Sequence, residues 1–158
     1  MTQVQEPQEI AFHLQDAQSL YERDFALWLE TTTALLRAKQ FEQIDLENLI
    51  EEIESMGKSE KSAVRSNLTV VLMHLLKWKY QAGKRTNSWQ SSIFEHRVRL
   101  DDEFMDSPSL KRYYLELFAK CYQVARKQAA IETGLNLSTF PVESPFTPEQ
   151  VLDSEFLP

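Results

Sequence analysis

Apolar residues recur at the three- and four-residue spacing of an α-helix along most of the chain. The first such stretch begins near Leu20, and its apolar face holds Phe25, Trp28, Leu29, Thr32 and Leu36. Only three glycines and six prolines occur among the 158 residues, and four of the prolines fall in residues 141–158. Because helix breakers are this rare, the pattern predicts helices rather than a turn-rich β fold.

A second helix is predicted from Asp45, whose side chain can cap the first turn, to Gly57, which is placed as the C-terminal stop. Ser59 can cap a third helix that runs to about Gln81. Since only Gly57-Lys58 separates these two helices, we expect them to pack antiparallel or at a steep angle. The second helix carries one apolar stripe, expected to be buried, made of Leu46, Leu49, Ile50, Ile53 and Met56.

The third helix is apolar on most of its sides, which is typical of the central helix of a bundle. A fourth helix is expected over about Ser88 to Met105, and a fifth from Ser107-Pro108 to Gly134. Cys121 lies on the apolar face of the fifth helix and is interpreted as a small core residue. The main apolar positions of the three helices are Val64, Leu68, Val71, Leu72, Leu75 and Trp78, then Trp89, Ile93, Leu100 and Phe104, then Leu110, Tyr114, Leu117, Cys121, Val124 and Ile131.

The tail is punctuated by prolines, and Thr147-Pro148-Glu149-Gln150 has the capping-box pattern of one short helix. Its apolar residues are expected to pack on the bundle. The sequence therefore predicts an all-α fold, a bundle of about five helices around a central long helix with an ordered Pro-containing tail. Residues 1–16 are read as a flexible lead-in and 17–158 as a single helical domain, with the bundle at 17–133 and the packed tail at 134–158. The tail residues expected to pack are Phe140, Phe146, Val151, Leu152 and Phe156.

Several functional classes find no support in the sequence. A single cysteine excludes an intramolecular disulfide framework, and the first residues lack the basic start and apolar stretch of a signal peptide. The most apolar run, Val70 to Leu76, is too short to span a bilayer. No Gly-rich phosphate loop, nucleophile elbow or paired-cysteine motif occurs. We therefore expect a cytoplasmic protein with no membrane segment and no cofactor, and the sequence favours a non-enzymatic role over an enzymatic one.

The formal net charge of −7 conceals a strong segregation of charge along the chain. Residues 1–60 hold 4 Lys and Arg against 13 Asp and Glu, residues 61–100 hold 8 against 1, and residues 101–158 hold 5 against 10. Two interpretations stay open: oppositely charged helices pair within the protein, or a charged surface meets a macromolecular partner.

The acidic run includes Glu47, Glu51 and Glu54, which share one helical face. Together with His74 and with His96, placed in the middle of the apolar stripe of the fourth helix, they could bind a divalent metal. Carboxylates and imidazoles projecting from bundle helices are common metal ligands. The Glu-x-x-His motif of di-iron bundles is absent. The alternative is that the carboxylates pair with Lys or Arg, while the histidines form hydrogen bonds within the core.

Between the third and fourth helices, basic and aromatic residues alternate, as in sites that contact phosphates and stack on bases. The alternative is a structural corner in which the tryptophans anchor the core and the lysine side chains reach water. The candidate contacts for nucleic acid or a protein partner are Lys77, Lys79, Lys84 and Arg85.

Several stretches resemble a bacterial family, abundant in cyanobacteria, that is known only as domain of unknown function twenty-nine. The resemblance covers about residues 17–158 and implies an all-α fold, but it brings no activity and no catalytic residue. The resembling stretches are Tyr21–Phe25 with Trp28, Asp45–Gly57, Met73–Trp78, Ser88-Trp89, Ser107–Leu110, Glu132–Gly134 and Gln150–Asp153.

Taken together, the sequence favours a small interaction or regulatory module that binds a protein partner. A metal-dependent enzyme and a nucleic-acid-binding or toxin–antitoxin-like component are the alternatives.

Overall fold

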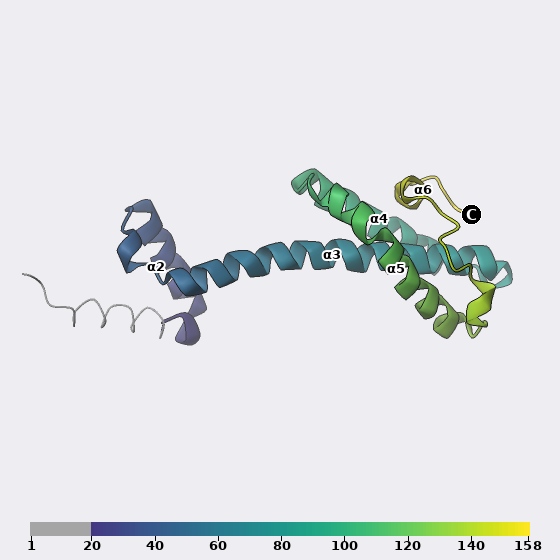
Figure 1. Ribbon diagram of the computed structural model, residues 1–158, viewed down its shortest axis with the longest axis horizontal. Helices are drawn as coiled ribbons and strands as arrows, with labels where there is room; N and C mark the ends of the chain where they lie inside the picture. Colours follow the sequence, from purple (N-terminus) through teal and green to yellow (C-terminus); the bar gives the residue numbers. More distant parts are fainter. Residues whose placement is uncertain (1–19) are drawn as a thin grey trace, which may run out of the picture. The chain divides into compact units, whose positions relative to one another are not determined.

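A computed structural model describes residues 20–158, so the predicted lead-in at residues 1–16 lies outside the described part. The described residues form α-helices joined by turns and short 3₁₀ helices, which confirms the predicted all-α class (Figure 1). The α-helices are α2 (Phe25–Arg37), α3 (Leu46–Tyr80), α4 (Asn87–Asp106), α5 (Leu110–Thr133) and α6 (Pro148–Leu152). The 3₁₀ helices are η1 (Phe41–Gln43), η2 (Ala82–Lys84) and η3 (Leu137–Thr139).

The chain divides into two compact units, Met1–Gly57 and Lys58–Pro158, and each is described by itself. In the first unit, Asp24 caps α2 by accepting a hydrogen bond from the backbone N–H of Leu27 at 3.0 Å. Asp45 caps α3 as predicted, because its Oδ1 accepts from the N–H of Asn48 at 3.3 Å. Trp28 and Ile44 are buried in this unit.

The predicted helix stop at Gly57 is wrong, because α3 continues through this residue and is 35 residues long in total. A glycine ends a helix when it adopts a left-handed conformation, as Gly134 does after α5 with φ of 70°, and Gly57 has no positive φ. Its intrinsic cost inside a helix is only about 1 kcal/mol, which hydrogen bonds of the adjoining turns can offset. The two helices that were expected to face each other are therefore consecutive parts of α3.

The second unit has its core where the sequence predicted it. Residues of α3 from Val64 to Leu76 pack against α4 and α5, and the tail closes over them (Figure 1). Phe140, Phe146 and Val151 are buried, and Leu152 and Phe156 pack against the core, as predicted. Cys121 is buried, and burial raises the pKa of its thiol.

Three predicted helix boundaries in this unit can be compared with the structure. Thr147 and Gln150 form the predicted capping box of α6, with the Thr147 hydroxyl accepting from the Gln150 N–H at 3.2 Å. Gly134 ends α5 as predicted. The start of α5 is displaced: Pro108 lies in the turn before the helix, and Ser109 is the N-cap.

Candidate interaction surface

The first turns of α3 present a row of apolar side chains to solvent, in contrast to the buried stripe that was predicted. Leu46, Ile50 and Ile53 lie at i, i+4 and i+7 and are 56%, 51% and 60% exposed. Met56 beside them is also exposed, and Gly57 continues the row at i+11, where a Cβ would meet no atom within 4 Å. The helical spacing was read correctly, but the described part of this unit does not cover the face.

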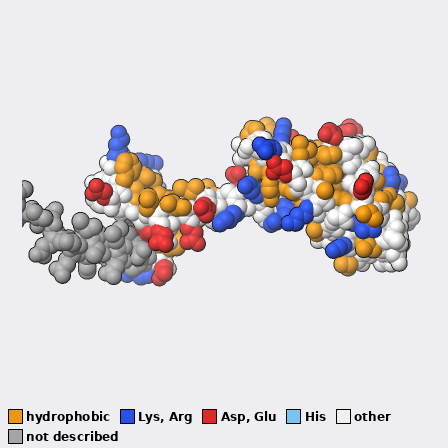
Figure 2. Space-filling view, in the orientation of Figure 1, with side chains coloured by type: hydrophobic (Ala, Val, Ile, Leu, Met, Phe, Trp, Pro, Cys, Tyr) orange, Lys and Arg blue, Asp and Glu red, His pale blue; other side chains and the backbone are white. Residues whose placement is uncertain are grey.

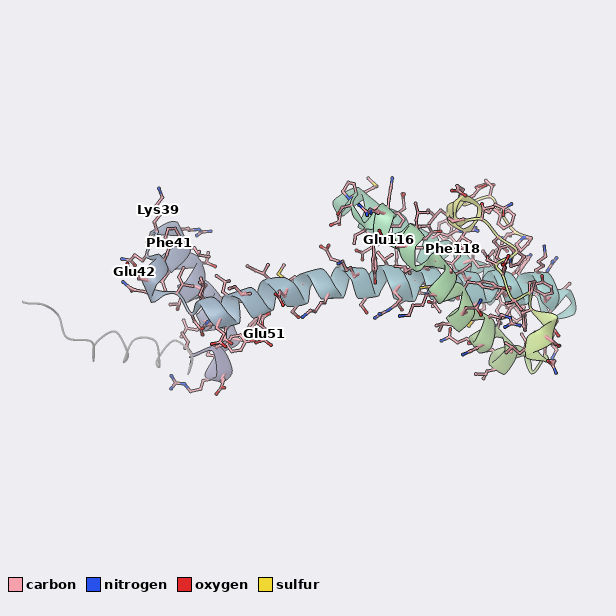
Figure 3. The ribbon with its side chains drawn as sticks, viewed as in Figure 1. Lys39, Phe41, Glu42, Glu51, Glu116 and Phe118 are labelled. Carbon is pink, nitrogen blue, oxygen red and sulfur yellow. The ribbon has the colours of Figure 1, made fainter. Side chains whose placement is uncertain are left out.

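A second row, of carboxylates, runs beside the apolar one. Glu47, Glu51 and Glu54 have the same i, i+4, i+7 spacing, displaced by one residue, and all three are exposed. In Figure 2 the hydrophobic side chains gather over α2 and the first turns of α3, and acidic side chains line the edge below them. Figure 3 places Glu51 on this part of α3. The surface made of these two rows is called the α3 docking face below.

A different side of α3 holds α2 in place. The Tyr21 hydroxyl donates to Glu52 Oε1 at 2.5 Å, and this hydrogen bond raises the pKa of Tyr21 to about 12. The Tyr21 ring also packs edge-on against Phe25 and Trp28, with centroid separations of 5.7 and 4.9 Å. These contacts use the side of α3 that carries Glu52, and they leave the docking face open.

The exposed apolar surface of the first unit extends beyond α3. Phe41, in the connection between α2 and α3, is 60% exposed (Figure 3). On α2, Phe25 and Leu29 are also exposed. Large apolar side chains that gather in this way mark interaction sites more often than scattered ones do.

The five predicted metal ligands are divided between the two units. Glu47, Glu51 and Glu54 belong to the first, and His74 and His96 to the second. Across residues 20–158, no three His, Cys, Asp or Glu side chains form a group able to hold a metal ion. The metal prediction thus gains no support within either unit.

Both histidines have hydrogen-bond partners in the second unit. His74 Nδ1 lies 3.0 Å from the carbonyl oxygen of Val70, and His96 Nδ1 lies 2.7 Å from Asn67 Oδ1. Because these oxygens only accept, each Nδ1 carries the proton. Burial lowers the pKa of both imidazoles. These contacts correspond to the alternative interpretation of the two histidines, in which they form hydrogen bonds within the protein.

The placement of His96 in the middle of the apolar stripe of the fourth helix is wrong. The buried row of α4 consists of Ile93, Arg97, Leu100 and Phe104, with His96 partly exposed at its side. A guanidinium group therefore occupies the buried position. Sequence reasoning missed Arg97, although its place at i+4 from Ile93 was a signal that could have found it.

The four basic residues proposed as contacts, at the end of α3 and in the connection to α4, differ in exposure. Lys77 is buried, and its ammonium donates to Glu132 Oε2 at 2.6 Å and lies 4.5 Å from the centre of the Trp89 ring. Arg85 donates to the carbonyl of Trp78 at 2.8 Å and packs on its ring at 5.0 Å. Lys77 is thus a core contact rather than a surface cation, whereas Lys79, Lys84 and Arg85 are exposed. Lys79 lies 5.8 Å from the centre of the Phe146 ring.

Residues 20–157 match the family model described as "Domain of unknown function DUF29", and the chain belongs to this family. The chain matches no curated protein and no solved structure. None of the described helices combines the length and apolar character that crossing a bilayer requires.

Proposed function

We propose that this protein is a docking module whose α3 docking face binds a basic amphipathic helix of a partner protein. The observation that carries this proposal is the exposed apolar row Leu46, Ile50 and Ile53 with a parallel row of carboxylates beside it. An amphipathic helix is recognised through anchors at i, i+3 or i+4 and i+7, and the exposed row offers complementary contacts at this spacing.

The length of the row fixes the size of the partner segment. From Leu46 to Gly57 the helix advances about 16 Å, or about three turns. A partner helix of three to four turns would cover the row. Gly57 at its end has no side chain, so a partner backbone can approach closely there.

Charge supports a basic partner over a second copy of the chain. Residues 20–57 hold 9 Asp and Glu against 3 Lys and Arg, a net of −6. If two copies packed by the same row, the carboxylates of one would approach those of the other and repel them. A partner with Lys or Arg flanking its apolar stripe would gain from the same carboxylates, mainly in specificity and association rate.

The test is a fluorescence anisotropy titration with a designed 14-residue helical peptide that carries leucines on one face and lysines beside them. Binding to the unmodified protein is expected in the micromolar range. Ile50→Asp with Ile53→Asp should weaken it about tenfold or more, because charge replaces apolar anchors. The matched control is Leu115→Asp with Ile131→Asp, two exposed apolar positions of α5, and it should bind the peptide normally.

Equal weakening by both pairs of substitutions would contradict the proposal, because the loss of binding would then not depend on the apolar row of α3. Light scattering of the protein without peptide tests whether a second copy of the chain binds this face instead. A dimer that dissociates in the Ile50→Asp, Ile53→Asp variant would identify a second copy as the partner and overturn the proposed one.

A further inference from the structure

Arg97 is a buried charged residue that the docking face does not use. It projects from α4 and is only 6% exposed. Its Nε donates to the carbonyl of Val151 at 2.8 Å, and its Nη2 donates to the carbonyls of Gln150 and Phe156 at 3.3 and 2.9 Å. The guanidinium thereby holds the tail, including α6, against α4 (Figure 1).

These partners are neutral, so they leave the positive charge of Arg97 without a counter-ion in contact. In residues 20–158, no carboxylate oxygen lies within 4.0 Å of this guanidinium. Burial lowers the pKa of Arg97, and Asp153, which is not in contact, acts in the opposite direction. Buried charges are ordinarily paired or bound to a ligand, which makes this one a candidate binding group.

One edge of the guanidinium remains available. Within the described part of the chain, Nη1 has no hydrogen-bond partner, and it is not among the fully buried unpartnered atoms. Arg97 lines a groove of about 290 Å³ beside α6. The groove has apolar walls with two polar residues also lining it, and its main lining residues are Phe94, Val98, Leu152, Asp101 and Ser154.

We propose that this groove binds a small monocarboxylate with an apolar body, whose carboxylate accepts hydrogen bonds from Arg97 and whose body packs on Phe94, Val98 and Leu152. A carboxylate would supply the missing counter-charge, and guanidinium–carboxylate hydrogen bonds are among the stronger ones in proteins. Apolar walls with a few polar or charged groups are typical of sites for such ligands. Asp101, which also lines the groove, would disfavour a second negative charge on the ligand.

Isothermal titration calorimetry tests the site with three probes. Octanoate represents an acyl chain, N-acetyl-leucyl-phenylalanine an apolar peptide terminus, and octanamide is the uncharged counterpart of octanoate. We expect at least one of the two carboxylates to bind, and octanoate to bind about tenfold more tightly than octanamide if the acyl chain is the natural source. The acetylated dipeptide would bind more tightly than octanoate if a peptide terminus is the source.

Two variants locate the binding. Val98→Trp should fill the groove and abolish binding while leaving the hydrogen bonds of Arg97 intact. Its matched control, Val124→Trp, replaces a valine of similar exposure on α5 (44% against 42%) and should bind as the unmodified protein does. Arg97→Gln should remove the preference for a carboxylate, with circular dichroism reporting whether its helices are retained.

The proposal is overturned if neither carboxylate binds the unmodified protein at millimolar concentration, or if Val98→Trp binds as well as Val124→Trp. Equal affinity for octanoate and octanamide would overturn the role of Arg97. None of these outcomes depends on the α3 docking face, so this site and the proposed function can fail separately.

Discussion

Lys77 of α3 donates a hydrogen bond of 2.6 Å to Glu132 near the end of α5, 55 residues later in the chain. The side chain of Lys77 is 8% exposed and that of Glu132 is 46% exposed, so the contact joins a buried cation to a carboxylate at the surface. The Trp89 ring of α4 packs beside the same ammonium at 4.5 Å. Three helices of the second unit thus meet at one buried charge.

Glu132→Gln should therefore destabilise the second unit, because it leaves the buried ammonium of Lys77 without a charged partner. We expect a loss of about 1 to 2 kcal/mol in the free energy of unfolding, toward the low end of charged hydrogen bonds because Glu132 is half exposed. Urea denaturation at neutral pH measures it. The control is Glu116→Gln on α5 (Figure 3), which breaks an exposed pair with Arg112 and should cost less than about 0.5 kcal/mol. Equal losses in the free energy of unfolding would show that the contact of Glu132 with Lys77 stabilises the protein no more than an exposed ion pair does.

Gly57→Ala should stabilise the protein. Gly57 lies inside α3 without a positive φ, and a Cβ there meets no atom within 4 Å. The alanine should add about 0.5 to 1 kcal/mol to the free energy of unfolding, because it reduces the entropy lost when the helix forms. Thermal and urea denaturation measure the change. A loss of stability would indicate that Gly57 ends a helix after all, since alanine is strained in a left-handed cap.

The stability of the second unit should fall on acidification through its histidines. Burial lowers the pKa of His74, near Lys77 and Glu132, and of His96, near Arg99 and Glu95. Below the unfolded pKa of about 6.5, the unfolded chain binds protons that the folded chain resists. The stability that the neutral histidines contribute to the folded state is therefore fully present above that pH and decreases below it.

Comparison of urea denaturation at about pH 7.5 and about pH 5.5 measures this effect. A variant with His74→Gln and His96→Gln should lose less stability between the two pH values than the unmodified protein does. An identical loss in both proteins would assign the pH dependence to other groups.

Much of the second unit follows from its sequence, because its signals are local or periodic. Gly134 and the Thr147–Gln150 capping box mark helix ends by chemistry confined to a few residues. The apolar row from Val64 to Leu76 was correctly assigned to the core. Periodicity is sufficient when a neighbouring helix covers the face that it identifies.

Three features could not be obtained from the local sequence pattern. The row Leu46, Ile50 and Ile53 has the same period as a buried one, and periodicity identifies a helix face without stating what covers it. The position of Arg97 on the face of Ile93 can be read from the sequence, but the groups that allow its burial cannot. The carbonyls that accept its hydrogen bonds belong to a tail more than 50 residues away, which only the tertiary fold brings to α4. The glycine at position 57 was misread because composition alone does not distinguish an αR glycine from an αL one.

The most direct test of the α3 docking face is an exchange of its charge preference. Glu47→Lys with Glu51→Lys reverses two carboxylates beside the apolar row and leaves Leu46, Ile50 and Ile53 unchanged. Anisotropy titrations would compare two helical peptides with the same leucine stripe, one flanked by lysines and one by glutamates. We predict that the unmodified protein prefers the lysine peptide and the variant prefers the glutamate peptide, with both preferences weakening as salt increases. An unchanged preference in the variant would contradict the claim that this face selects its partner.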